Sequence, residues 1–202
     1  MTLTINQMST IIEDVKKLRE MTGAGMMDAK KALEEAGNIE EAVAVLRKKG
    51  HASVAKKSDR ATKEGIVSTY VHAGGKVGVM VELNCETDFV ARNEEFKELA
   101  TEIALHIAAT GALVVSREQV DPSLVESEKA IYLDQVKDKP ENIQEQIVNG
   151  KLDKYYEQVV LLEQPYVRDP DKKIKDLVAE KVGKLGENIQ IRRFAKFVLG
   201  AE

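Results

Sequence analysis

The spacing of apolar residues divides the chain into a helical N-terminal stretch and a longer stretch of mixed periodicity. Over residues 9–50, apolar side chains recur every three or four positions, which is typical of amphipathic helices. Residue types typical of helix starts and ends divide this stretch further. They are Thr10 with Glu13 and Asn38 with Glu41 as N-terminal caps, and Gly23, Gly37 and Gly50 at the expected ends. We therefore predict three short helices within an N-terminal domain of residues 1–54.

An alternation of period two begins at residue 65, after a segment of small and charged residues at 51–64 that we expect to be a partly helical linker. Residues 66–72 and 77–84 are predicted to be strands, because successive side chains there alternate between two faces. The short glycine-rich connection at 73–76 predicts a hairpin, and strands joined in this way are antiparallel. Residues 189–198 alternate again and predict a final strand.

Helical periodicity returns in three further segments. They are residues 93–110, 121–164 and 174–186. Pro140 separates two helical pieces of the second segment, and the Asn149-Gly150 pair predicts another break within it.

These elements predict an α+β fold with a three-helix head followed by a body of residues 55–202. In the body, we expect helices to pack on one face of an antiparallel sheet. The pattern leaves open the place of the last strand in that sheet and the role of the helical segment 121–164.

Composition narrows the classes of function. Of the 202 residues, 43% are apolar and 32% are charged, and the net charge is −4. A protein that binds nucleic acid through its phosphates needs an excess of Lys and Arg, which this chain lacks. Aromatic residues make up only 4% and there is no Trp, so a base-stacking surface is not expected either. We expect no direct contact with nucleic acid.

The chain also lacks the sequence features of membrane and secreted proteins. No run approaches the roughly 20 consecutive apolar residues of a transmembrane helix, and residues 1–8 do not form a secretory signal. We therefore expect a cytoplasmic protein without membrane contact. The single cysteine, Cys85, excludes an intrachain disulfide and a four-cysteine metal site.

Residues that often carry chemistry do not form a recognisable catalytic constellation. The histidines at 51, 72 and 106 lack metal-ligand spacing, and the glycines at 74–75 and 183–186 lack the spacing of a phosphate-binding loop. Cys85 could act as a nucleophile with a distant histidine, or it could pack as a small core residue. We predict no catalytic residue, no metal site and no cofactor.

Two segments are candidates for contacts with a protein partner. Phe89 lies in a polar stretch between a predicted strand and a predicted helix. It either packs against its own helix or projects outward as an anchor for a partner's pocket. Residues 18–27 contain two glycines flanked by methionines, and they form either a simple turn or an adaptable contact surface.

Four segments resemble, in this order, recurrent segments of the translation elongation factor Ts family in its short bacterial form. They are LREMTGAGMMDAKKAL at 18–33, NCETDFVARNEEF at 84–96, LLEQPYV at 161–167 and LGENIQIRRF at 185–194. The resemblance implies a head similar to ubiquitin-associated domains. It also implies a guanine nucleotide exchange factor that acts on the GTPase elongation factor Tu during translation elongation and is not itself an enzyme.

The resemblance further implies which residues contact the GTPase. The phenylalanine of the TDF motif, here Phe89, would be pushed into the GTPase near its Mg²⁺ site and so promote GDP release. The implied contact residues are Thr87, Asp88, Phe89 and Val90 in the TDF segment; Leu18, Arg19, Thr22, Gly23, Ala24, Gly25 and Met26 in the head; and Lys56, Lys57, Leu185 and Gly186 elsewhere.

The chain is too short for the two core subdomains of longer family members. The resemblance therefore implies that a second copy supplies the missing half, and we expect a homodimer. From the residues alone, two other functions stay open. The head could bind ubiquitin-like or nascent-chain partners, with the body as a dimer platform. Alternatively, the chain could be a small enzyme that uses Cys85.

Overall fold

The structure is a computed structural model, which describes residues 5–201 and the side chains from residue 12 onward. The chain forms two compact units, each assembled from segments that are distant in sequence. The first contains the chain up to Gly65 together with Asn84–Leu99 and Asp176–Gln190, and the second contains Ile66–Leu83, Ala100–Lys175 and the chain from Ile191 onward. Helices and small antiparallel sheets are both present, so the predicted α+β class is confirmed.

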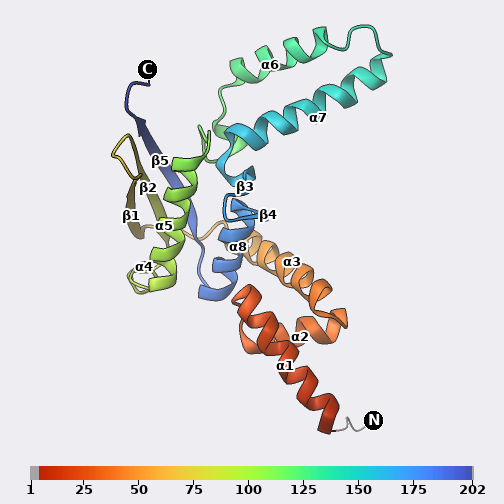
Figure 1. Ribbon diagram of the computed structural model, residues 1–202, viewed down its shortest axis with the longest axis vertical. Helices are drawn as coiled ribbons and strands as arrows, with labels where there is room; N and C mark the ends of the chain where they lie inside the picture. Colours follow the sequence, from red (N-terminus) through yellow and green to blue (C-terminus); the bar gives the residue numbers. More distant parts are fainter. Residues whose placement is uncertain (1–4, 202) are drawn as a thin grey trace. The chain divides into compact units, whose positions relative to one another are not determined.

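Three helices form the predicted head within the first unit (Figure 1). They are α1 (Ile5–Thr22), α2 (Met26–Ala36) and α3 (Ile39–Lys57). Its core consists of buried residues from all three helices: Val15, Leu18, Ala29, Ala32 and Ala42. Asn38 caps α3 as predicted, because its side-chain oxygen accepts a hydrogen bond of 2.8 Å from the Glu41 N–H. Gly37 ends α2 in the left-handed conformation, with φ 81°.

Two predicted ends of the head helices are wrong. α1 already begins at Ile5, so the pair at positions 10 and 13 lies inside the helix rather than at its start. α3 continues straight through Gly50. A Cβ at Gly50 would lie only 3.2 Å from the carbonyl oxygen of Ala179 in α8 (Ile174–Leu185). Gly50 therefore permits a close approach of α3 to α8 and does not end a helix.

The segment after α3 is correspondingly shorter than the predicted linker. α3 runs to Lys57 and the first strand begins at Glu64, so only residues 58–63 lie between them. The domain boundary predicted between residues 54 and 55 falls inside α3 and stays a prediction.

Most of a three-stranded antiparallel sheet lies in the second unit. Its strands, in spatial order, are β1 (Glu64–Val71), β2 (Val77–Cys85) and β5 (Gln190–Val198). The predicted hairpin between β1 and β2 is confirmed, with the His72 N–H donating to the Val77 carbonyl at 2.9 Å. Leu199 bonds to Lys76 at one end of β5, whereas Arg193 pairs with Glu82 further along. β5 is therefore antiparallel to β2, which settles the place of the last strand.

The predicted alternation of β2 gives the sheet one buried face. Val79, Val81 and Leu83 are buried, whereas Met80 between them is exposed. α5 (Glu94–Ala109) runs beside the strands in Figure 1. Its buried stripe has the helical spacing expected for residues 93–110: Phe96, Leu99, Ala100, Ile103 and Ile107. Its start is also as predicted, because the Asn93 side chain accepts a 2.8 Å hydrogen bond from the Glu95 N–H.

The chain between α5 and β5 is largely helical. Its elements are η1 (Arg117–Gln119), α6 (Pro122–Asp134), α7 (Glu141–Val159), η2 (Leu161–Glu163), β3 (Pro165–Tyr166), β4 (Asp169–Lys173) and α8. α6 and α7 pack against each other as a helical hairpin around Val136, Val148 and Leu152. Pro140 separates these helices as predicted. The small antiparallel pair of β3 and β4 was not predicted.

The break predicted at Asn149-Gly150 is wrong, because α7 runs through both residues. Asn-Gly is a strong turn signal when local preference decides the conformation. Here Val148, just before the pair, and Leu152, two residues after it, are buried in the hairpin with α6. Tertiary packing therefore overrides the local preference.

Gly150→Ala is expected to raise the free energy of unfolding by about 0.5–1 kcal/mol, because alanine favours the helix. Apart from the adjacent residues and the backbone of α7 itself, no atom lies within 4 Å of the added Cβ. Urea unfolding monitored by circular dichroism measures the change. Gly50→Ala is the matched control, since the same substitution in α3 meets the Ala179 carbonyl and should stabilise less. A loss of stability in Gly150→Ala would show that α7 is not helical at that position.

Candidate functional site

The TDF segment forms a short helical turn, α4 (Asp88–Ala91), between β2 and α5. The Phe89 side chain on this turn is exposed, with 81% of the residue's surface accessible. Thr87 is the N-cap, and its hydroxyl oxygen accepts a hydrogen bond of 3.5 Å from the Val90 N–H. Ala91 is buried and fixes the opposite side of the turn. The interpretation of Phe89 as a residue packed on its own helix is therefore wrong, and the ring is presented outward.

Cys85, just before this turn, is a structural residue. It is fully buried, and its Sγ donates to the Thr87 carbonyl at 3.1 Å. Burial, reinforced by the nearby charge of Glu187, raises the pKa of Cys85 to about 11. The thiol is therefore protonated and inaccessible at neutral pH, which does not fit a nucleophile.

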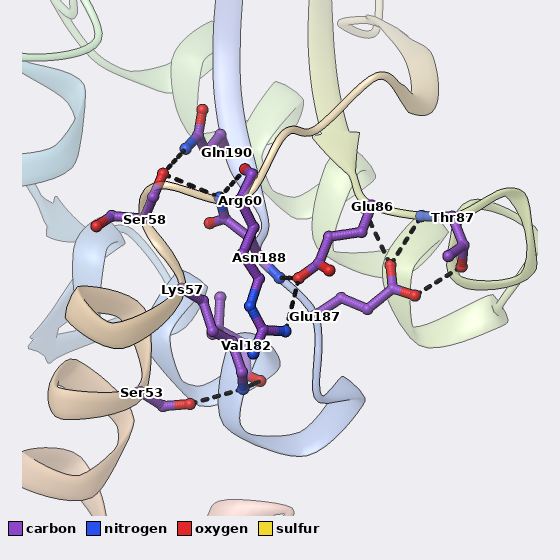
Figure 2. Close-up of polar contacts among 10 residues, drawn as sticks. All are labelled: Ser53, Lys57, Ser58, Arg60, Glu86, Thr87, Val182, Glu187, Asn188 and Gln190. Carbon is purple, nitrogen blue, oxygen red and sulfur yellow. Dashed lines mark hydrogen bonds and ion pairs between the residues drawn. The ribbon is translucent and has the colours of Figure 1, made fainter.

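Glu187, from the segment that follows α8, holds the start of α4 (Figure 2). One carboxylate oxygen accepts hydrogen bonds from the Glu86 N–H at 3.1 Å and from the Thr87 N–H at 3.0 Å. The other accepts a 2.6 Å hydrogen bond from the Thr87 hydroxyl. A single side chain thus binds both backbone and side-chain donors at the N-terminus of the Phe89 turn.

Glu86 makes the reciprocal connection. Its carboxylate accepts a 2.6 Å hydrogen bond from the Asn188 N–H and pairs with Arg60 at 3.3 Å. The Asn188 N–H, followed by Arg60, lowers the pKa of the Glu86 carboxyl. The Asn188 side chain, only 1% exposed, donates to the carbonyls of Ser58 and Arg60 at 3.3 and 2.9 Å. We call Glu86, Thr87, Glu187 and Asn188 the clasp.

Sequence reasoning did not single out Glu187 or Asn188. Both lie about 100 residues from their partners, and an isolated Glu-Asn pair has no local signal of a role. They are, however, the two residues that follow Leu185 and Gly186, which the family resemblance implies as partner contacts. The clasp therefore joins two of the implied contact segments, the TDF turn and residues 185–186, in one unit.

The turn between α1 and α2 presents methionines at the surface of the head. Met21, Met26 and Met27 are all exposed. Gly23 adopts φ 66°, a conformation that other residues rarely take. The Thr22 hydroxyl stabilises the turn, because it donates to the Leu18 carbonyl at 2.6 Å and accepts from the Ala24 N–H at 3.3 Å.

The remaining implied contact residues differ in accessibility. Arg19 is exposed and donates to the Ala24 carbonyl at 3.3 Å, whereas Leu18 is fully buried in the head core. Lys56 is exposed, but Lys57 is half-buried and donates to the Ser53 hydroxyl at 2.8 Å and to the Val182 carbonyl at 3.4 Å. Leu185 is half-buried, and Gly186 is exposed with φ 79°.

The histidines have structural partners. His106 is buried, bonds to Gln164 at 2.8 Å and has its pKa lowered by burial. His51 bonds to Asp176 at 2.7 Å, and His72 bonds to Tyr70 at 3.1 Å. Across the described residues, no three His, Cys, Asp or Glu side chains are grouped as metal ligands. Nor does any helix in that part of the chain have the length and apolarity to cross a bilayer.

Comparison with known proteins places the chain in a family. The family described as Elongation factor TS matches residues 2–184. The protein named elongation factor Ts from Thermotoga petrophila is 58% identical over 187 residues, which cover 92% of this chain and 94% of the relative. The protein of the same name from Thermotoga neapolitana is 55% identical over 196 residues, which cover 96% of this chain and 100% of the relative. The one from Geotalea uraniireducens is 54% identical over 196 residues, which cover 96% of this chain and 91% of the relative. The chain therefore belongs to the elongation factor Ts family.

Proposed function

We propose that this chain is a guanine nucleotide exchange factor for elongation factor Tu, which promotes GDP release in the cytoplasm during translation elongation and performs no bond chemistry. The observation that carries the proposal is the exposure of Phe89 on a turn that the clasp holds in place. A rigidly held aromatic side chain is well suited to enter a pocket of a partner protein, because little conformational freedom is lost on binding.

Exchange of this kind follows from linkage. A factor that binds the nucleotide-free GTPase more tightly than the GDP-bound form must weaken GDP binding by the same factor. Bound GDP and Mg²⁺ are held by many charge-assisted contacts, which depend on accurate geometry. In our proposal, Phe89 enters the GTPase near its Mg²⁺ site and disturbs these contacts. Such a mechanism needs no titratable group, in agreement with the buried, protonated thiol of Cys85.

We further propose that three other groups of residues contact the GTPase together with Phe89. They are Thr87, Asp88 and Val90 beside the ring; Arg19, Thr22, Gly23, Ala24, Gly25 and Met26 in the head; and Lys56, Lys57, Leu185 and Gly186. The exposed methionines of the head suit an adaptable contact, because their side chains are flexible and polarisable. Leu18, which is buried, would support this surface from within the head.

Stopped-flow release of fluorescent GDP from purified elongation factor Tu tests the proposal. The release rate should rise with the concentration of the unmodified chain and then saturate. The same chain unfolded by heat is the control. If a saturating concentration of the folded chain leaves the release rate unchanged, the proposed function is wrong.

We also propose that the chain acts as a homodimer through the outer face of its sheet. Val67, Met80 and Phe197 are exposed on this face, which carries a hollow of about 240 Å³. Arg193 and Glu82 form an ion pair there at 2.7 Å. A two-fold interface uses the same patch on both copies, and a patch that carries both charges can match itself. A second copy would also cover these apolar side chains.

Light scattering after size-exclusion chromatography measures the assembly state. The unmodified chain is expected to elute with twice the 22.4 kDa mass of one chain. Met80→Asp places a charge at the centre of the face and should lower the measured mass to that of a single chain. A monomeric mass for the unmodified chain would contradict the homodimer and leave the exchange proposal to its own test.

A further inference from the structure

We infer that Glu187 is a positioning residue for Phe89: its carboxylate sets the orientation of the turn that carries the ring. This inference rests on the proposed exchange function. Glu187 does not itself have to touch the GTPase, because it acts through the hydrogen bonds that it accepts from Glu86 and Thr87.

The turn has few bonds of its own: the Ala91 N–H donates to the Thr87 carbonyl at 3.2 Å and the Arg92 N–H to the Asp88 carbonyl at 3.1 Å. α4 has only 4 residues, and a helix of that length is unstable in isolation. Its N-cap bond, from the Val90 N–H to the Thr87 hydroxyl oxygen, is long at 3.5 Å. The ion pair between Asp88 and Arg92 is exposed and contributes little. The orientation of α4 therefore depends on contacts with other segments: the burial of Ala91 on one side and the hydrogen bonds to Glu187 at its start.

Glu187 supplies three acceptor contacts at the point where α4 begins. A carboxylate is acceptor-only, so all three donors can point to it at once. The Thr87 hydroxyl donates to Glu187 and accepts from Val90, which fixes the rotation of that side chain. The direction of Thr87 and the start of α4, which carries Phe89 two residues after Thr87, are thereby tied to one carboxylate.

The carboxylate is itself held in place by its neighbour in sequence. Asn188 is buried, and its side chain bonds to the backbone carbonyls of Ser58 and Arg60. Its N–H donates to the Glu86 carboxylate, while the Glu86 N–H donates to the Glu187 carboxylate, so each segment of the clasp both donates to and accepts from the other. Because Gly186 adjoins Glu187, the clasp also fixes the distance between Phe89 and the 185–186 surface.

The chain offers a direct readout of this orientation, because it contains no Trp. Phe89→Trp introduces a single indole at the tip of the turn. Time-resolved fluorescence anisotropy then reports local motion of that ring without any partner. Adding Glu187→Ala is expected to increase the amplitude of fast local motion at least about twofold. Glu187→Gln keeps one acceptor oxygen. Its amplitude of fast local motion should lie between those of Phe89→Trp alone and Phe89→Trp with Glu187→Ala.

Glu102→Ala is the matched control. Glu102 is a half-buried carboxylate in the other unit, where it bonds to the Tyr166 hydroxyl and pairs with Arg168 at 2.8 Å. Its loss should lower stability without changing the motion of the introduced indole. If Glu187→Ala also leaves this motion unchanged, Glu187 does not position the turn and the inference is overturned.

A double-mutant cycle on GDP release connects positioning to exchange. Glu187→Ala alone should lower the maximal release rate about tenfold, with a smaller change in the half-saturating concentration. In a Phe89→Ala background, the same substitution should have little further effect, because Glu187 acts through Phe89. Additive effects of the two substitutions would overturn the inference. Failure of the unmodified chain to accelerate release would instead refute the exchange function, and with it a role of Glu187 in exchange, whatever the anisotropy shows.

Discussion

A Phe89→Ala chain is expected to accelerate GDP release from elongation factor Tu about thirtyfold less than the unmodified chain at equal concentration. Truncation of an aromatic anchor at the centre of an interface costs about 2 kcal/mol or more, which corresponds to about thirtyfold. The ring is 81% exposed in the free protein, so its loss should change the free energy of unfolding by less than about 0.5 kcal/mol. Stopped-flow kinetics and urea unfolding measure the two quantities.

Two comparison variants make this result specific. Leu113→Ala removes another exposed apolar side chain, at 64% exposure, and should leave the release rate unchanged. Phe89→Leu keeps apolar bulk but loses the rigid ring, and should give an intermediate rate. If Phe89→Ala accelerates release as well as the unmodified chain, Phe89 is not the residue that disturbs GDP binding. The head turn and residues 185–186 then become the surfaces to test.

Leu18→Ala is expected to lower the free energy of unfolding of the head by about 2–5 kcal/mol, the usual cost of a cavity left by a fully buried leucine. Leu18 is at 0% exposure in the core that α1 shares with α2 and α3. A head with so small a core has little stability to spare, so such a loss should unfold a large fraction of it at 37 °C. Circular dichroism during urea unfolding measures the change.

Ile12→Ala on the same helix is the matched control for Leu18→Ala. Ile12 is 54% exposed, so its truncation should cost less than about 0.5 kcal/mol. A similar loss in both variants would mean that burial in this small core does not decide its stability.

The elements that follow from local periodicity were predicted well. The three head helices, the β1–β2 hairpin and the buried stripe of α5 each depend on side chains that repeat within one segment. Caps made by a neighbouring residue, such as Asn38, were predictable for the same reason. Such features need only a few consecutive residues, and the sequence contains them directly.

Two of the errors, at Gly50 and at Asn149-Gly150, arose where another segment decides the conformation. Gly50 has the appearance of a helix end, and only the presence of Ala179 shows that it permits a close crossing. Asn149-Gly150 has the appearance of a turn, yet packing of its neighbours against α6 keeps it helical. The same limit applies to the candidate site. Phe89 was identified from its motif, but its exposure and its anchor, Glu187, depend on residues about 100 positions away.

The two alternatives to an exchange factor are an enzyme that uses Cys85 and a binding module that uses the head, and the structure favours neither. A nucleophilic role for Cys85 is disfavoured by its burial and its raised pKa. A binding module that used only the head would not need an exposed aromatic ring on a separately anchored turn. The exchange function is the proposal that uses both the head surface and Phe89.

The sequence separation within the clasp has a consequence for how the protein is made. Glu86 and Glu187 are 101 residues apart, so contacts across the clasp close a long loop and carry a high contact order. A chain emerging from the ribosome can complete the head as soon as its first helices are free, because those contacts are local. The Phe89 turn can reach its final orientation only after residues 187 and 188 have been synthesised. On this basis the turn that carries Phe89 is among the last parts of the molecule to reach its final conformation.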